Sequence, residues 1–175
     1  MARRAVVMLI LLGVAARAET NFGARGQVVP FGNVSYAHTS AGGISVDLLK
    51  FNPGTFWFPT NNVAIGGSVL YQYQHNSLFG GVSVHSVGFE PLVGFGVPLA
   101  EHVAFFPRVG MAFTWQLPSP GNSTDRIFID GFAPVLFIPA PHFYIGVGPS
   151  LAVDVASSFA KETTVGFTTE IGGYF

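Results

Sequence analysis

The feature that most constrains this chain is a two-residue alternation of large apolar side chains with small or polar ones. It recurs in eight segments separated by clusters of turn-forming residues, near 27–38, 44–58, 63–75, 82–97, 103–116, 126–138, 143–155 and 163–175. In the seventh segment, for example, Ile145 and Val147 alternate with Tyr144, Gly146 and Gly148. Successive side chains of a β-strand point to opposite faces, so this period predicts eight strands, each with one oily face.

Composition indicates that these strands lie in a membrane. The chain is 49% hydrophobic and only 10% charged, whereas about 25% of the residues of a soluble domain are charged. After residue 18, no apolar run is long enough for a membrane helix, and the 22 glycines and 12 prolines disfavour helices generally. Closed barrels are the only other structures that satisfy their backbone hydrogen bonds inside lipid.

The predicted fold is therefore all-β, an eight-stranded antiparallel up-and-down transmembrane β-barrel. The charged residues share a face with Gly, Ala and Ser, so we expect the oily face to point outward and the polar face to fill the lumen. A soluble ligand-binding barrel of the lipocalin type would have the opposite arrangement. Because eight strands enclose little space, we expect a packed polar lumen and no large pore.

The start of the chain predicts export. Arg3 and Arg4 precede an apolar stretch, and Ala16-Arg17-Ala18 has the small residues of a cleavage site. We expect a signal peptide over residues 1–18, cleaved after Ala18, and a barrel domain over 19–175. The stretch has about a dozen residues, fewer than the roughly 20 of a membrane-spanning helix. The expected location is the cell outer membrane, with both termini periplasmic.

The connections predict which end of the barrel faces which compartment. Residues 59–62, 98–102 and 139–142 have the composition of tight turns, which face the periplasm in bacterial barrels. Residues 39–43, 76–81, 117–125 and 156–162 have that of longer polar loops, which we expect on the outer side. Six prolines fall inside predicted strands, for which we expect a belt of β-bulges in the periplasmic half. They are Pro30, Pro53, Pro91, Pro107, Pro134 and Pro149.

Charged residues on the inner face predict a network of ion pairs, because an unpaired charge in a narrow lumen costs several kcal/mol. We expect Arg108 to pair with Glu90 and Asp130, which lie on the two flanking strands. A pathway for protons or ions is the alternative interpretation. The charges assigned to the lumen are Lys50, Glu90, Arg108, Asp130, Asp154 and Glu170.

Several chemistries lack the residues they need. There is no cysteine, which excludes disulfides and thiolate metal sites, and the net charge of −1 without a basic block gives no sign of a nucleic-acid partner. None of the five histidines forms a helical i, i+4 pair or an HExxH motif. We therefore assign no metal, no cofactor and no catalytic residue.

Three stretches carry a resemblance to a known family: residues 26–32, residues 140–149, and the ending Ile171-Gly172-Gly173-Tyr174-Phe175. With eight amphipathic strands and an export signal, the chain resembles the small eight-stranded bacterial outer-membrane β-barrel family, which includes OmpA-like and OmpX-like barrels. The resemblance implies that Phe175 is an assembly signal read by the barrel-insertion machinery and that outer-membrane lipid surrounds the barrel. It names no external partner.

The expected role is non-enzymatic, either structural or in surface interactions. Three alternatives stay open: a narrow conduit or binder for a small hydrophobic molecule, a lipid A-modifying hydrolase, and a soluble periplasmic lipocalin-like binder. The second is suggested by His38-Thr39-Ser40, which is similar to the His-x-Ser pair of outer-membrane lipid A deacylases, with Asp47 as the possible acid. We prefer the interpretation of this segment as a polar loop entered from a strand end.

Overall fold

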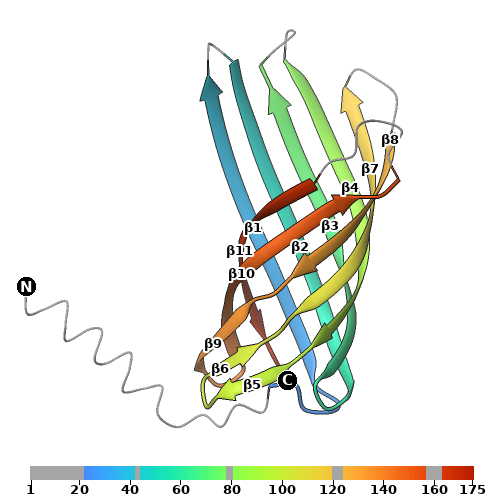
Figure 1. The fold of residues 1–175 in the computed structure, drawn as a ribbon. Helices are drawn as coiled ribbons and strands as arrows, with labels where there is room; N and C mark the ends of the chain where they lie inside the picture. Colours follow the sequence, from blue (N-terminus) through green and yellow to red (C-terminus); the bar gives the residue numbers. More distant parts are fainter. Residues whose placement is uncertain (1–21, 42–43, 78–80, 120–123, 157–162) are drawn as a thin grey trace, which may run out of the picture.

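The computed structural model describes residues 22–41, 44–77, 81–119, 124–156 and 163–175, and in these residues it is an all-β, closed barrel of eight antiparallel segments (Figure 1). This confirms the predicted fold class. Five segments are continuous strands: β1 (Val28–Ala41), β2 (Ile44–Thr60), β3 (Val63–Asn76), β10 (Phe143–Asp154) and β11 (Thr163–Gly173). The other three are interrupted once each, as β4 (Val82–Phe95) with β5 (Val97–Ala100), β6 (Val103–Phe105) with β7 (Arg108–Ser119), and β8 (Thr124–Phe132) with β9 (Val135–Ala140).

One end of the barrel carries three tight turns together with both ends of the described chain, as Figure 1 shows at the bottom. The turns follow β2, β5 and β9, as predicted, and Asn62 and His142 take positive φ angles of 69° and 63° to reverse the chain. This end is termed the turn end and the opposite one the outer end. The predicted signal peptide and most of the predicted outer loops lie outside the described residues. No helix among the described residues is long and apolar enough to cross a membrane.

The outer surface carries the oily face of the strands. Along the first half of β10, for example, exposed Phe143, Ile145 and Val147 alternate with buried Tyr144. The same alternation exposes Val69 and Val93 on β3 and β4. The predicted orientation, with large apolar side chains outward, therefore holds around the barrel wall.

The predicted belt of bulges is wrong. The register shifts lie close to turns, at Trp57/Thr60, Pro98/Ala100 and Phe143/Ile145, and among the described residues none coincides with the six prolines that predicted the belt. Near the prolines the ladder lapses for a few residues and then resumes in the same register. Single bonds cross three of these gaps, since the amide N–H groups of Phe95, Phe106 and Ala133 donate to the carbonyls of Pro107, Pro134 and Pro149 at 2.9, 3.0 and 3.1 Å. Proline here removes hydrogen bonds without changing register, and this divides two wall segments into two strands each.

The turn half of the lumen is filled by an aromatic core rather than by small and polar side chains. Phe22 stands at its centre, with its ring 5.3 to 6.0 Å from four other aromatic rings. The expectation that inward positions hold only small or polar residues is therefore wrong for this half. The aromatic core comprises Phe22, Val29, Phe31, Phe56, Phe58, Ala64, Leu92, Ala104, Phe106, Leu136, Ile138, Tyr144 and Tyr174.

Glycines opposite the large side chains make room for this core. Phe31 pairs in register with Gly54, Phe56 with Gly66, and Tyr144 with Gly172. In each pair a Cβ built on the glycine would lie within 3.0 Å of the partner ring. A ring can therefore lie flat over the neighbouring strand, which lets eight strands enclose several aromatic residues.

Candidate binding cavity

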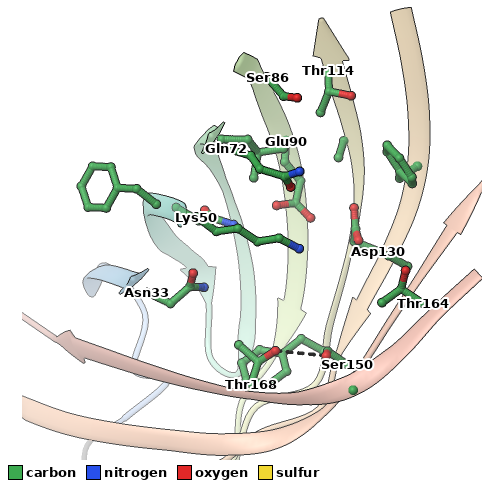
Figure 2. A pocket seen from close by; sticks show the side chains of 18 of the residues that line it. Asn33, Lys50, Gln72, Ser86, Glu90, Thr114, Asp130, Ser150, Thr164 and Thr168 are labelled. Atoms are coloured by element: carbon green, nitrogen blue, oxygen red, sulfur yellow. Dashed lines mark hydrogen bonds between the residues drawn. The ribbon is translucent and has the colours of Figure 1, made fainter. Parts of the chain in front are cut away.

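Above the aromatic core, the outer half of the lumen contains a cavity of about 780 Å³. Small-molecule sites in proteins typically measure about 300–1,000 Å³. The prediction of a packed lumen therefore holds for the turn half and fails for the outer half. Figure 2 shows the polar side chains that point into this cavity, among them Asn33, Lys50, Gln72, Ser86, Glu90, Thr114, Asp130, Ser150, Thr164 and Thr168.

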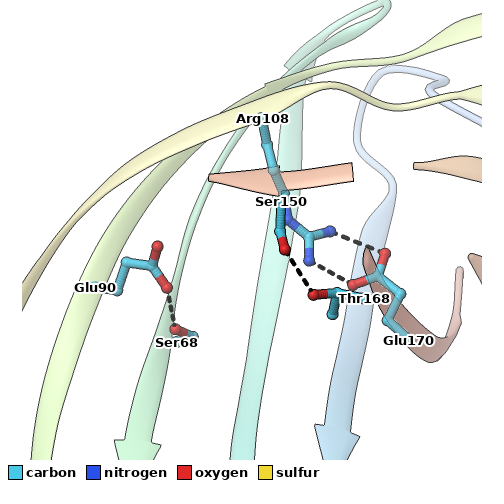
Figure 3. Close-up of polar contacts among 6 residues, drawn as sticks. All are labelled: Ser68, Glu90, Arg108, Ser150, Thr168 and Glu170. Atoms are coloured by element: carbon cyan, nitrogen blue, oxygen red, sulfur yellow. Dashed lines mark hydrogen bonds and ion pairs between the residues drawn. The ribbon is translucent and has the colours of Figure 1, made fainter. Parts of the chain in front are cut away.

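An ion pair forms the floor of the cavity. The guanidinium of Arg108 donates two hydrogen bonds to the carboxylate of Glu170, one of them 2.9 Å long (Figure 3). Its Cζ also lies 4.7 Å from the ring centroids of both Phe31 and Phe132. Both charged side chains are almost fully buried, at 6% and 0% exposure. Arg108 thus joins the polar cavity to the aromatic core and helps to separate the cavity from the turn end.

The partner of Arg108 differs from the prediction. We expected Glu90 and Asp130, which lie on the neighbouring strands β4 and β8, but Glu170 reaches Arg108 from β11, which is not adjacent to β7 in the sheet. Only closure of the barrel brings these two strands face to face across the lumen. No pairing rule based on sequential neighbours could find this contact.

A second ion pair lies nearer the outer end. Arg126 on β8 donates from Nε and Nη2 to Asp154 on β10, at 3.0 and 2.6 Å, and its Cζ lies 4.7 Å from the Phe128 ring centroid. Asp154 was predicted to face the lumen, whereas Arg126 was missed. Arg126 and Asp130 are four residues apart, so alternation places both side chains on the same face of the strand. Arg126 nevertheless lies at the edge of its predicted strand, and for that reason it was not assigned to the lumen.

The remaining predicted charges face the cavity from three sides. Glu90 accepts a hydrogen bond of 2.9 Å from the hydroxyl of Ser68. Lys50 and Asp130 line the cavity from β2 and β8, and within the described part of the chain neither forms an ion pair within 4.0 Å. These three side chains are therefore the charged groups available to a ligand.

A separate polar cluster lies on the outside of the barrel near the outer end. The carboxylate of Asp47 lies 2.7 Å from Nδ1 of His38 and accepts a hydrogen bond of 2.7 Å from the hydroxyl of Tyr36. His75 on the neighbouring strand β3 pairs in register with Asp47. Its Nδ1 lies 3.0 Å from the hydroxyl of Ser83. The side chain of Ser40 lies outside the described residues. Among the residues described, no group of three or more His, Asp or Glu side chains is placed to hold a metal ion.

The end of the chain lies at the junction where the barrel closes. Phe175 and Val28 exchange two backbone hydrogen bonds, of 2.9 and 3.0 Å, and the Phe175 ring stacks on His142. The Phe175 side chain is 73% exposed. It is thus accessible at the turn end.

Comparison of the chain with models of known protein families and with curated protein sequences finds no match.

Proposed function

We propose that this protein is an integral outer-membrane barrel that binds a small molecule in its outer half and does not conduct through its turn half. Of the roles considered from the sequence, binding is the one that uses the observed cavity. The single observation that carries it is a space of about 780 Å³, lined by charged and apolar side chains, above a filled aromatic core. A purely structural role would not need a hollow lined by charged groups.

The outer surface supports location in a membrane. Large side chains such as Phe89, Val93 and Val147 are about half exposed along the wall, at 48%, 52% and 51%. In water each would cost the free energy of exposed apolar surface, about 25 cal/mol per Å². In lipid the same surface is matched to its solvent, and the backbone of a closed sheet is internally satisfied.

The filled turn half supports a role other than that of a pore. Phe56, Phe58 and Phe106 are fully buried there, and Phe22 covers them from the turn end. A water-filled path would have to pass through this aromatic core. The Arg108–Glu170 pair adds a second obstacle directly above it.

Two measurements test this proposal. Membrane fractionation with heat-modifiable gel mobility should place the folded chain in the outer membrane. Recording in planar bilayers should show no steady current through the inserted barrel. Recovery of the folded chain in the soluble periplasmic fraction would contradict the membrane location, and a stable ohmic conductance would contradict the closed turn end.

Assembly at the outer membrane is part of the same proposal. The exposed ring of Phe175 is available at the turn end for recognition by the barrel-insertion machinery. Phe175→Ala should lower the amount of heat-modifiable barrel in the membrane, whereas Phe137→Ala, which removes an outward ring from β9, should not. Equal yields of the two variants would remove this role from Phe175.

A second candidate function is hydrolysis of an ester in an outer-leaflet lipid. The observation in its favour is the contact of 2.7 Å between His38 and Asp47, because a carboxylate oriented on a histidine is the arrangement that activates a serine nucleophile. An assay for acyl chains released from lipid A, run with Ser40→Ala and His38→Ala, tests it. Activity that survives both substitutions would exclude this site.

A further inference from the structure

The ladder that closes the barrel is incomplete at the outer end. All 14 residues of β1 pair with β2, but β1 pairs with β11 only through Phe31 with Gly172 and Gly32 with Ile171. Beyond these pairs the described residues show no ladder between the two strands. Figure 1 shows β1 and β11 diverging toward the outer end. The gap between residues 33–38 of β1 and residues 163–169 of β11 is termed the seam.

The cavity reaches this seam. Asn33 and Val34 line the cavity from β1, and Phe167 and Thr168 line it from β11. Val34 and Phe167 belong to the outward rows of their strands and are 68% and 83% exposed. Because no ladder joins the two strands beyond Gly32 and Ile171, the cavity is open between them toward the surroundings of the barrel.

A molecule that fills this opening has to satisfy the backbone polar groups along the two strand edges. Each unsatisfied backbone N–H or C=O group exposed to hydrocarbon costs several kcal/mol, so strand edges facing lipid need a polar partner. Three of the side chains that flank the seam on the outside, Val34, Val165 and Phe167, are apolar and strongly exposed. An occupant that is polar on the cavity side and apolar on the bilayer side meets both conditions.

The charges in the cavity narrow the class of occupant. The backbone of Lys50 lies next to β1, where its neighbour in register is Ser35, and its side chain extends into the cavity toward Glu90 and Asp130 on β4 and β8 (Figure 2). A zwitterion with an anionic group toward Lys50 and an ammonium group toward the two carboxylates matches this arrangement. A strand from a second copy could cover the edges of the seam, but it would bring no zwitterionic group to these charges.

We propose that the cavity binds the headgroup of a zwitterionic phospholipid that reaches it through the seam while its acyl chains stay in the bilayer. This rests on the proposed function, because it requires the barrel to lie in a membrane. The seam is then the lateral route between bilayer and cavity. The cavity, which the Arg108–Glu170 pair closes from below, holds the headgroup and does not pass it to the turn end.

The ligand class can be tested with the full mature chain refolded in detergent and mixed with equal amounts of phosphatidylethanolamine and phosphatidylglycerol. Native mass spectrometry should show the monomer retaining phosphatidylethanolamine in preference to phosphatidylglycerol. Asp130→Asn should reduce retention about tenfold, the effect of losing one hydrogen bond to a charged group. Asp125→Asn, the same change on an exposed residue that does not line the cavity, should retain lipid like the unaltered chain.

Three results would overturn the ligand class. The inserted barrel could retain no lipid, it could retain both lipids equally, or it could form a dimer in place of the lipid-bound monomer. All three leave the membrane location intact, since heat-modifiable mobility reports that separately. Failure of the chain to insert at all would instead contradict the proposed function.

The route can be tested by closing the seam. Continued in the register of Phe31 with Gly172, a closed seam would pair Val34 with Thr169. The chain has no cysteine, so Val34→Cys/Thr169→Cys introduces a single possible disulfide. The matched control is Val69→Cys/Phe89→Cys, which joins two strands that are already paired.

Oxidation in lipid-free detergent should close the seam of the first variant and reduce uptake of added phosphatidylethanolamine to background, with recovery after reduction. The control should take up lipid equally in both redox states. A seam pair that resists oxidation under conditions that oxidise the control would show strands held apart, which also supports the lateral route. Undiminished uptake by the oxidised seam variant would overturn it.

Discussion

The two halves of the lumen solve the same packing problem in different ways. In the turn half, aromatic rings lie over glycines of the next strand and fill the space completely, as Tyr144 does over Gly172. In the outer half, polar side chains of similar alternation leave a cavity of about 780 Å³, and the wall itself is incomplete along the seam. Strand number alone therefore does not decide whether a small barrel is filled. The residues opposite each large side chain decide it.

The largest expected effect comes from removing part of the aromatic core. Phe106 is fully buried against Phe22 and Phe56, with ring centroids 5.3 and 5.0 Å away. Phe106→Ala should lower the free energy of unfolding by about 3–5 kcal/mol. Urea titration in lipid vesicles, followed by the fluorescence of Trp57 and Trp115, measures the change.

The matched control is Phe137→Ala, which removes an outward ring that is 47% exposed. It should cost clearly less than Phe106→Ala. If both variants lose the same free energy, the turn half is not the stabilising core of the barrel and the contrast between the halves fails.

The next effect concerns the boundary between the halves. Arg108→Met leaves the carboxylate of Glu170 buried without its guanidinium, a change that typically costs about 3 kcal/mol or more. Arg108→Met/Glu170→Leu removes both charges and should recover most of the loss, because replacing a buried pair by apolar residues is often neutral. A double variant as unstable as the single one would show that the pair contributes through its contacts with Phe31 and Phe132 instead.

A smaller effect tests the role of glycine directly. A Cβ on Gly172 would overlap the ring of Tyr144, so Gly172→Ala should cost about 1–3 kcal/mol through overpacking. Gly166 lies on the same strand, and a Cβ there would meet its nearest atom, Oγ of Ser150, at an ordinary 3.6 Å. Gly166→Ala should therefore be close to neutral in the same urea titration. Equal losses would mean that glycine acts through strand propensity and not through space for the ring.

The sequence predicted the wall of the barrel much better than its interior. Eight segments and three tight turns follow from local alternation and turn residues, which neighbouring positions determine. The aromatic core does not, because Phe56 and Gly66 become partners only when the register between β2 and β3 is known. Alternation placed Tyr144 on the inner face, but it could not show that this ring packs with several others into one core.

The charged site shows the same limit. Alternation assigned Lys50, Glu90 and Asp130 to the inside, where they line the cavity. It could not show that Arg108 is bound by Glu170, since that contact crosses the lumen between strands far apart in the sheet. The cavity and the seam could not be predicted from the sequence either. Each depends on where hydrogen-bond pairing between neighbouring strands stops, and the alternation within a single strand does not indicate this.

The smallest expected effect lies on the outside of the outer half. Asp47 is hydrogen-bonded to His38 and Tyr36, but all three side chains lie in the exposed rim of β1 and β2. Exposed pairs contribute little because solvent screens them, so Asp47→Asn should leave the free energy of unfolding close to that of the unaltered chain. The urea titration used for Phe106→Ala measures this difference on the same scale. A loss as large as that of the core variant would mean that the rim of β1 and β2 stabilises the barrel as strongly as the aromatic core, and the contrast between the two halves would fail.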